Sequence, residues 1–520
     1  MNLTIHDLSL EEKVGQMLFA RHFRVLQDPR YAPLLERRLI GGIQANPVAP
    51  EPFSRETLDA INRQLRVPLF VGSDAEAGLR VAGVKGTVLP PPAALGALGD
   101  ERAAYEAGRI TALELMAAGV NMVWGPVVDV NRLPDGVMAL RCYGNTMRTT
   151  IPLALAVLRG YLEQGMIATA KHYPGGSSHS TEDNHIVSPE EGQDLARACA
   201  WDLRIYRAAM EAGLNGIMTT HYMVQEGAQC IPATFSQEAI AMIRQEGFDG
   251  LIITDSLAMA ALRTRWSNEE CIRRSMAAGH DLILVDYKQD PGEAFEMMLH
   301  AVRCGAVPEA QVNRSVARIL REKQRLARVR LPALSEEQYG RHQAFARQLA
   351  ARAVTLRNAR PLDRSAAHLI LYSRCRPQRA GNEVDLNTEQ ADFARQLAAV
   401  FPNSQLLSVP EWPVGEIERI LRRVAAAGSL IVVGEAQSTA YRGTCDYSRP
   451  FVSLVRGVAH KIACFIHFGN PSAVRELPAG IANLLIAYSG ETAEQATLDV
   501  LANPELAQGR YEVPDGRLDP

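Results

Sequence analysis

Eight short apolar runs alternate with longer amphipathic segments over the first 330 residues of this 520-residue chain. They are GQMLFARH from Gly15, GGIQAN from Gly41, VPLFVGSD from Val67, VNMVWGPVVD from Val120, MIATAKHYPG from Met166, GIMTTHY from Gly216, GLIITDS from Gly250 and DLILVD from Asp281. Apolar runs of strand length, separated by segments of helix length, are typical of βα units around a parallel sheet. Eight such units predict an α/β fold, a (β/α)8 TIM-like barrel over residues 1–330.

A second series of apolar runs predicts a separate domain. The stretch RHQAFARQLAARAVTLRNARPL indicates a helix that runs into a strand and ends at Pro361. Four or five strand candidates then alternate with helical segments: HLILYSR from His368, SQLLSVP from Ser404, SLIVVGE from Ser429, KIACFIHFG from Lys461 and NLLIAYS from Asn483. We therefore expect a linker helix and connection over residues 331–360, followed by an α/β sandwich domain over residues 361–520.

The charge balance argues against two classes of partner. With 55 Lys and Arg against 58 Asp and Glu, the formal charge is −3, which gives no global field to hold nucleic acid or an anionic membrane. No segment approaches the roughly 20 apolar residues of a membrane span, and no signal peptide is legible. The eight cysteines are scattered without a CxxC pair, which is typical of free thiols in a reducing compartment. We expect a cytoplasmic protein, and the sequence leaves its oligomeric state open.

Polar side chains follow several of the predicted barrel strands. They are Asp74, Glu76, Asp129, Lys171, His172, His221 and Asp255. The reactive groups of such barrels lie at the C-terminal ends of the strands. One acid at a strand end is more often a helix cap or a turn residue. Five strand ends that carry both acids and bases are harder to explain as caps. The chain has no HExxH and no HxH on its first strand, so a metallohydrolase would lack its usual ligand spacing.

The stretch KHYPGGSSHSTEDNH, from Lys171 to His185, is dense in titratable groups. Asp183 and His185 are separated by one residue, which in extended backbone places both side chains on the same side. This spacing predicts an Asp/His dyad, because a carboxylate fixes the tautomer of a neighbouring imidazole and favours its charged form. Such a group suits proton donation followed by proton retrieval. Two other interpretations stay open: a solvated loop, and a metal site built from His179, Asp183 and His185.

Four segments resemble glycoside hydrolase family 3, in its β-N-acetylglucosaminidase branch. They are AGVNMVWGPVVDVN (Ala118 to Asn131), KHYPG (Lys171 to Gly175), DNH (Asp183 to His185) and GFDGLIITDSLAM (Gly247 to Met259). The resemblance extends over nearly the whole chain and includes the order of the two domains. It implies a glycosidase that acts on a small carbohydrate and requires no cofactor and no metal.

The resemblance also implies roles for individual residues. Asp255 falls on the nucleophile of the family, and His185 falls on its acid/base with Asp183 as the partner of that histidine. The residues that match sugar-binding positions are Asp74, Arg141, Lys171 and His172.

Two segments depart from the family pattern. A D-Q-E-G-G-R segment reads DAEAGLR here, so Ala77 replaces a Gly, Leu79 stands at the Arg position, and an Arg follows one place later at Arg80. The loop between KHYPG and DNH is one residue longer than expected and reads GGSSHS in place of a G-H-G run. His179 is a candidate for the displaced histidine. Both departures leave the sugar preference open.

The resulting prediction is an exo-acting retaining glycoside hydrolase that releases β-linked N-acetylglucosamine through a covalent glycosyl-enzyme. A phosphorylase of the same family, which would transfer the sugar to phosphate, is the nearest alternative, and a β-glucosidase is the next. A catalytically silent sugar-binding protein is the alternative from a different class, since the DAEAGLR segment is altered. The aglycone, the physiological substrate and the role of the C-terminal domain stay open.

Overall fold

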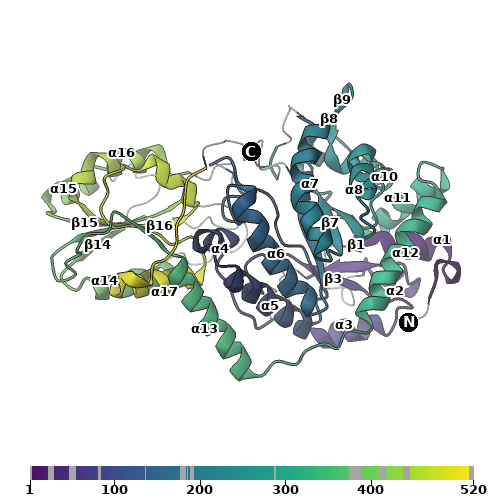
Figure 1. Cartoon of the computed structure of the whole chain (residues 1–520), viewed down its shortest axis with the longest axis horizontal. Coiled ribbons are helices and arrows are strands. Elements are labelled where there is room, and N and C mark those ends of the chain that lie inside the picture. Colours follow the sequence, from purple (N-terminus) through teal and green to yellow (C-terminus); the bar gives the residue numbers. More distant parts are fainter. Residues whose placement is uncertain are drawn as a thin grey trace. The chain divides into compact units, whose positions relative to one another are not determined.

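The computed structural model describes residues 3–20, 29–45, 54–79, 84–134, 136–175, 183, 185–187, 192–285, 289–373, 388–408, 417–436 and 446–514. The chain divides into two compact units (Figure 1). The first unit comprises Met1–Thr87, Glu101–Val130 and Thr150–His342, and the second comprises Val88–Asp100, Asn131–Thr149 and Gln343–Pro520. The domain boundaries that we expect from the sequence stay a prediction.

The first unit contains a parallel sheet of eight strands. In chain order they are β1 (Leu18–Ala20), β2 (Gly42–Gln44), β3 (Phe70–Ser73), β4 (Met122–Val123), β5 (Ile167–Tyr173), β7 (Gly216–Thr219), β10 (Leu251–Thr254) and β11 (Ile283–Leu284). Their order in the sheet is β10-β7-β5-β4-β3-β2-β1-β11. Each strand lies in one of the eight apolar runs. The prediction of a TIM-like barrel is therefore confirmed.

Hydrogen bonds beside β11 bring the two ends of this strand order together. The N–H of Thr254 donates to the carbonyl of Leu282 at 3.1 Å, and the N–H of Leu282 donates to the carbonyl of Ile252 at 3.1 Å. Ile253 and Leu282 form a parallel bridge at the same place. The sheet is thus nearly closed into a ring, and the C-terminal ends of its strands lie along one rim.

Helices return the chain between the strands and surround the sheet (Figure 1). They are α1 (Leu10–Met17), α2 (Ala32–Glu36), α3 (Arg55–Asn62), α5 (Glu101–Ala118), α6 (Met147–Glu163), α7 (Leu195–Glu211), α8 (Gln237–Gln245), α9 (Ala260–Arg263), α10 (Asn268–Ala278), α11 (Pro291–Arg303) and α12 (Glu309–Leu326). Short 3₁₀ helices are η1 (Ile5–Asp7), η2 (Ala233–Phe235), η3 (Ala459–Lys461), η4 (Pro471–Glu476) and η5 (Pro504–Leu506).

Local sequence explains where several of these helices begin and end. At the start of α1, the hydroxyl of Ser9 accepts the N–H of Glu12 at 3.2 Å, and the Glu12 carboxylate accepts the N–H of Ser9 at 2.9 Å. This reciprocal pair satisfies two N–H groups that the first helical turn leaves unpaired. Helix α5 ends before Gly119 and α7 ends before Gly213, whose positive φ angles of 90° and 94° suit the end of a helix.

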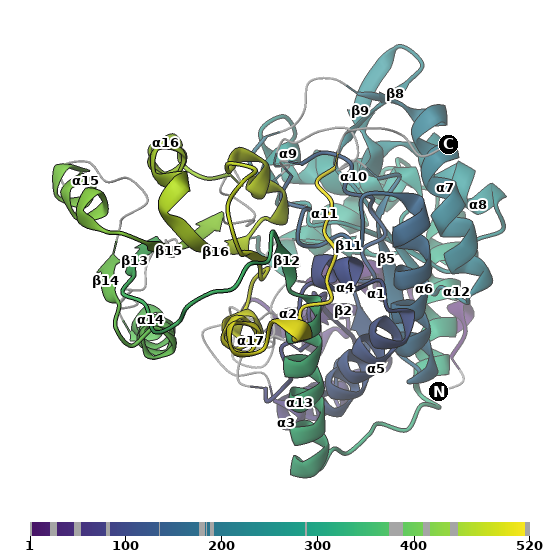
Figure 2. The same ribbon diagram turned by 60° about the vertical axis from the view of Figure 1, so that its left-hand side comes forward.

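A small three-stranded sheet accompanies the barrel. It contains β6 (Gln193–Asp194), β8 (Met223–Glu226) and β9 (Gln229–Pro232), with β6 parallel to β8 and β8 antiparallel to β9. The β8–β9 hairpin projects from the barrel in both views (Figures 1 and 2). These strands are not among the runs that the sequence predicts, since they are short and only partly buried.

The second unit contains a six-stranded sheet in the order β12-β17-β16-β15-β13-β14. The strands are β12 (Thr355–Arg357), β13 (Leu369–Ser373), β14 (Gln405–Ser408), β15 (Leu430–Ala436), β16 (Ile462–Gly469) and β17 (Leu484–Ile486). β12 pairs antiparallel with β17, and all the other pairs are parallel. The five predicted runs of this region coincide with β13 to β17, so the prediction of a second α/β domain is confirmed.

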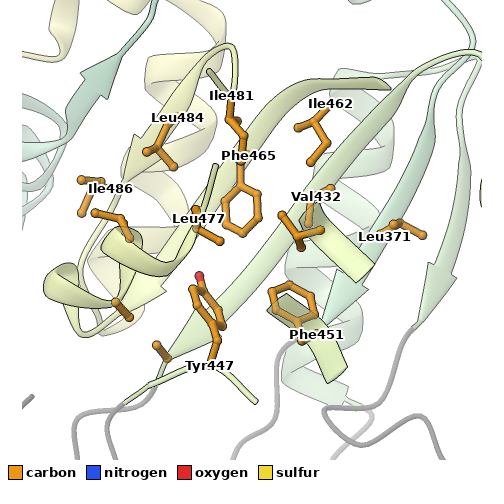
Figure 3. Packing of buried hydrophobic residues seen from close by; sticks show 14 of the residues in the cluster. Leu371, Val432, Tyr447, Phe451, Ile462, Phe465, Leu477, Ile481, Leu484 and Ile486 are labelled. Carbon is orange, nitrogen blue, oxygen red and sulfur yellow. The ribbon is translucent and has the colours of Figure 1, made fainter. Parts of the chain in front are cut away.

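Helices cover both faces of this second sheet (Figure 2). The helices that contribute to the second unit are α4 (Pro92–Leu98), α13 (Glu336–Ala353), α14 (Thr388–Val400), α15 (Ile417–Ala426), α16 (Arg449–Val458) and α17 (Glu491–Ala502). Strand alternation divides the core in two: Val432 and Phe465 belong to the cluster with α15 and α16 (Figure 3), whereas Val433 and Ile466 belong to the cluster with α14 and α17. The unit is therefore an α/β/α sandwich.

The helices and the cysteines of the described residues bear on two expectations from the sequence. None of the described helices is long and apolar enough to cross a membrane. The cysteines that form no disulfide are Cys142, Cys199, Cys230, Cys271, Cys304 and Cys464. Cys375 and Cys445 lie outside the described residues.

Leu371→Ala and Leu406→Ala compare the same substitution on two paired strands of the second sheet. Leu371 on β13 is 2% exposed, whereas Leu406 on β14 is 44% exposed. We expect Leu371→Ala to lower the free energy of unfolding by about 2–5 kcal/mol, because it leaves a cavity in the core. Leu406→Ala should change it by less than about 0.5 kcal/mol. Urea denaturation followed by circular dichroism measures both, and equal losses would contradict the assignment of the core.

Candidate active site

The C-terminal ends of the barrel strands carry a cluster of titratable side chains. Asp74 follows β3, Lys171 and His172 lie near the end of β5, and Asp255 follows β10. The sequence places Lys171 and His172 beyond their strand, but β5 extends to Tyr173, since Lys171 pairs with Met218 and Tyr173 with Thr219 of β7. Strands β5, β7 and β10 are neighbours in the sheet. The cluster therefore gathers on one part of the rim.

Lys171 forms ion pairs with two carboxylates. Its Nζ lies 2.7 Å from Asp74 Oδ1 and 2.7 Å from Glu76 Oε1. The Lys171 side chain is 2% exposed, so its charge needs anionic partners to offset the loss of water. The side chain of Asp74 is 45% exposed, and its Oδ2 also accepts from Gln44 Nε2 at 3.3 Å. Asp74 is thus held in place and can still meet a ligand.

His172 is held by Asp129. The carboxylate oxygen Oδ2 of Asp129 accepts the backbone N–H of His172 at 3.0 Å and lies 2.7 Å from its Nδ1. Asp129 is buried. Because an ionised carboxylate can only accept, Nδ1 of His172 carries a proton in this contact. The arrangement fixes both the main chain and the ring of His172.

Asp183 and His185 lie in direct contact, as their spacing predicts. Oδ1 of Asp183 accepts the backbone N–H of His185 at 2.9 Å and lies 2.7 Å from His185 Nδ1. The side chain of Asp183 is buried, whereas that of His185 is 19% exposed. The carboxylate therefore orients the ring and leaves the histidine as the member of the dyad that solvent or a ligand can reach.

Asp255 carries its charge among three imidazoles. Burial by itself raises the pKa of Asp255, but the positive fields of His221 and His172, the N–H of Ser256 and the field of His185 outweigh it and lower this pKa to about 2. The Ser256 N–H donates to Asp255 Oδ1 at 2.7 Å. The carboxylate of Asp255 is therefore ionised at neutral pH and lies within electrostatic reach of the dyad.

Three other residues of the sequence prediction keep roles that stay predictions. Arg141 belongs to the second unit, where its Nη1 donates to Met138 Sδ at 3.2 Å, and its role stays a prediction. Arg80 and His179 lie outside the described residues. Within the part of the chain that the structure describes, no group of three or more His, Cys, Asp or Glu side chains could hold a metal ion.

Two supporting residues have no role in the sequence prediction. Asp129 is among the strand-end residues of the sequence analysis, but its contact with His172 spans 43 positions and has no local signal. Gln44 ends the run GGIQAN and donates to Asp74. If amide side chains at strand ends are counted with the charged ones, the strand-end pattern includes Gln44 as well as Asp129.

The cluster combines three chemical capacities. Asp255 is an anion that can act as a nucleophile. His185 is an imidazole oriented by a carboxylate, which is the arrangement of a proton donor and acceptor. Asp74 and Lys171 present charged hydrogen-bonding groups of both signs, which suit the hydroxyl groups of a polar ligand.

A family model described as "Glycosyl hydrolase family 3 N terminal domain" matches residues 9–322, more than half of the chain. The chain is 26% identical over 384 residues to a β-N-acetylglucosaminidase/β-glucosidase of Cellulomonas fimi, a match that covers 69% of this chain and 66% of that protein. It is 30% identical over 314 residues to a β-hexosaminidase of Alkalilimnicola ehrlichii, covering 56% of this chain and 89% of that protein. The chain thus spans just under two thirds of the Cellulomonas protein.

Some solved structures match nearly the whole length of this chain, so the match covers the residues of both units. A family 3 β-N-acetylglucosaminidase from Paenibacillus sp. str. FPU-7 has a TM-score of 0.80 and 26% identity, with 98% of each chain covered. A β-glucoside phosphorylase also has a TM-score of 0.80, at 22% identity, with 99% of this chain and 95% of that chain covered. At that identity the second likeness shows the fold alone.

Gly175→Ala and Gly227→Ala separate backbone strain from crowding. Both glycines have positive φ angles, 73° and 59°. A Cβ at Gly175 would collide with the carboxylate of Asp202, whereas a Cβ at Gly227 meets nothing within 4 Å. We expect Gly227→Ala to cost about 1–2 kcal/mol of unfolding free energy. Gly175→Ala should cost about 1–3 kcal/mol more, because Asp202 must move. Denaturant titration of both variants tests this order, and a larger loss at Gly227 would contradict it.

Proposed function

The chain belongs to glycosyl hydrolase family 3, and from this premise we propose that it is an exo-acting retaining glycosidase that releases β-linked N-acetylglucosamine. The prediction of a family 3 glycosidase is confirmed at the level of the family. The relatives named as β-hexosaminidases and the β-N-acetylglucosaminidase fold neighbour support the choice of sugar. The observation that carries the mechanism is the ionised Asp255 within electrostatic reach of the Asp183–His185 dyad.

In the first step, a carboxylate oxygen of Asp255 attacks the anomeric carbon of the sugar. The bond between that carbon and the leaving oxygen breaks, and the leaving oxygen takes a proton from His185. Since Nδ1 of His185 contacts Asp183, Nε2 is the nitrogen that exchanges this proton. The product of the step is a sugar esterified to Asp255.

In the second step, water attacks the same carbon and releases Asp255. His185 accepts the proton of the water and thereby returns to its starting form. The two roles need different protonation states: the nucleophile must be ionised, while the acid must hold a proton. The low pKa of Asp255 and the carboxylate partner of His185 meet these two needs.

Sugar binding in this scheme falls to the remaining predicted residues. Asp74 and Lys171 would bond hydroxyl groups of the sugar as a charged pair, and His172 would do so from the ring that Asp129 orients. Arg141 is proposed for the same task from the resemblance alone.

Phosphorolysis is the alternative that a specific observation favours. An imidazole acid/base, unlike a carboxylate, does not repel an incoming phosphate dianion from the glycosyl-enzyme. Against it, among the described residues the groups that lower the pKa of Asp255 most are imidazoles and a backbone N–H, which do not form a cationic cluster for phosphate. We therefore propose hydrolysis as the main reaction.

Asp255→Asn should reduce turnover at least about a thousandfold, because it removes the proposed nucleophile, while sugar binding persists. A 2-fluoro or 5-fluoro glycoside should trap the wild-type enzyme as a covalent adduct, and mass spectrometry of the peptides should find the label on Asp255. A label outside residues 254–259 would refute the assignment.

His185→Ala should slow release of the sugar from Asp255 by about 10²–10⁴-fold, because no group then activates water. Formation of the glycosyl-enzyme should persist on a substrate with a very good leaving group, which needs little protonation. Burst kinetics with a dinitrophenyl glycoside separates the two steps. The control is His300→Ala, an exposed histidine of α11 that should change neither step.

A panel of nitrophenyl β-glycosides, assayed with and without phosphate, tests the sugar and the acceptor. We expect the N-acetylglucosaminide to be the best substrate and the free sugar to be the main product at millimolar phosphate. A sugar 1-phosphate as the main product would establish a phosphorylase. Preference for the glucoside would establish a β-glucosidase, and turnover of no glycoside would favour a silent sugar-binding protein.

A further inference from the structure

The buried His221 is a strand-end residue that the scheme above does not use. It lies two residues beyond β7 and is 0% exposed. Strand β7 pairs with β10 in such a way that Thr219 lies opposite Thr254. His221 and Asp255 therefore leave neighbouring strands at nearly the same level of the barrel.

Both ring nitrogens of His221 have hydrogen-bond partners. Nε2 lies 2.9 Å from the carbonyl oxygen of Ser256, and Nδ1 lies 2.7 Å from the hydroxyl of Thr234. A carbonyl can only accept, so Nε2 carries a proton and donates it to Ser256. The remaining question is whether Nδ1 donates or accepts.

Thr234 can supply a proton to Nδ1. Its hydroxyl lies 2.8 Å from the carbonyl of Thr220 and 2.7 Å from Nδ1 of His221, so it can donate to either acceptor. Burial lowers the pKa of His221, and the negative charge of Asp255 offsets this only in part, so the ring is neutral near pH 7. His221 gains the positive charge that lowers the pKa of Asp255 only at acidic pH. A neutral ring with its proton on Nε2 accepts the Thr234 hydroxyl at Nδ1.

A second buried histidine supports this direction of hydrogen bonding. His280 Nδ1 lies 2.9 Å from the carbonyl of Ser275 and therefore donates to it. Burial lowers the pKa of His280 to about 4, so its Nε2 accepts, and the donor is the hydroxyl of Thr219 at 2.9 Å. With its own proton committed to His280, Thr219 does not donate to the hydroxyl of Thr234, which lies 3.3 Å away.

Ser256 connects His221 to the nucleophile. Its N–H donates to Asp255 Oδ1 at 2.7 Å, and its carbonyl accepts from His221 at 2.9 Å. The same carbonyl also accepts the N–H of Met259 at 3.2 Å, a contact within the turn itself. The buried hydroxyl of Ser256 has no hydrogen-bond partner among the described residues. The bond from His221 is thus a contact that reaches Ser256 from the neighbouring strand.

We propose that His221 is a positioning residue for the nucleophile: as a neutral donor from Nε2 it holds the carbonyl of Ser256, and thereby the N–H that orients the Asp255 carboxylate. The inference rests on the proposed role of Asp255. A neutral donor suits this task because it fixes the turn without pairing a full positive charge with the carboxylate that must attack carbon. Misplacing a reacting group by about 1 Å costs roughly a hundredfold in rate.

Two amide substitutions test the proposal. The amide nitrogen of Gln reaches the position of His Nε2 and keeps the donor to Ser256, whereas the amide oxygen of Asn reaches the position of Nδ1 and keeps only the acceptor for the Thr234 hydroxyl. Both variants bury one amide at the same site, so each controls for the other in folding. The measurements are the first-order rate and the half-saturation concentration of covalent labelling by an activated fluoroglycoside, with thermal unfolding alongside.

We expect His221→Gln to label Asp255 within about fivefold of the wild-type rate and His221→Asn to label it about 10–100-fold more slowly. The half-saturation concentration should stay within about threefold in both, since the sugar contacts are unchanged. A loss of folding alone would lower the melting temperature of both variants and leave their rates equal. Equal or reversed rates in folded variants would overturn the inference while wild-type labelling of Asp255 stands. Wild-type labelling elsewhere would overturn the proposed function and this inference together.

Discussion

The hydrogen bonds between β10 and the segment before β11 close the ring of strands, and the site depends on that closure. Without them β10 would be an edge strand paired with β7 alone. The hydroxyl of Thr254 also accepts the N–H of Leu284 at 2.9 Å, so the residue before Asp255 is held from the β11 side as well. Strand pairing therefore fixes the position of the Asp255 main chain independently of the contacts that its carboxylate makes.

Three imidazoles act on Asp255, and each is held by a different acceptor. Asp129 holds His172, Asp183 holds His185, and the carbonyl of Ser256 holds His221. A carboxylate partner favours the charged form of an imidazole, whereas a carbonyl in a buried place orients a neutral one. In the roles that we propose, one residue type serves proton transfer, ligand binding and positioning within a single site, because the partner of each ring differs.

Sequence periodicity was sufficient to predict the eight barrel strands and strands β13 to β17 of the second sheet, since buried parallel strands are continuous apolar runs. The contact between Asp183 and His185 was also predictable, because a separation of two residues fixes it locally. The pairs Lys171–Asp74 and His172–Asp129 span 97 and 43 positions. Closure of the sheet creates such contacts, and no local pattern records them.

The double ion pair of Lys171 has a consequence for ligand selectivity. One ammonium and two carboxylates give these three described side chains together a formal charge of −1. A neutral sugar can exchange hydrogen bonds with Asp74 without changing that charge. A uronic acid or a phosphorylated sugar would bring a further anion near these two carboxylates, and unit charges 4 Å apart near a protein surface repel each other by about 4 kcal/mol. If Asp74 binds the sugar as we propose, the charge of these side chains would favour neutral sugars over acidic ones.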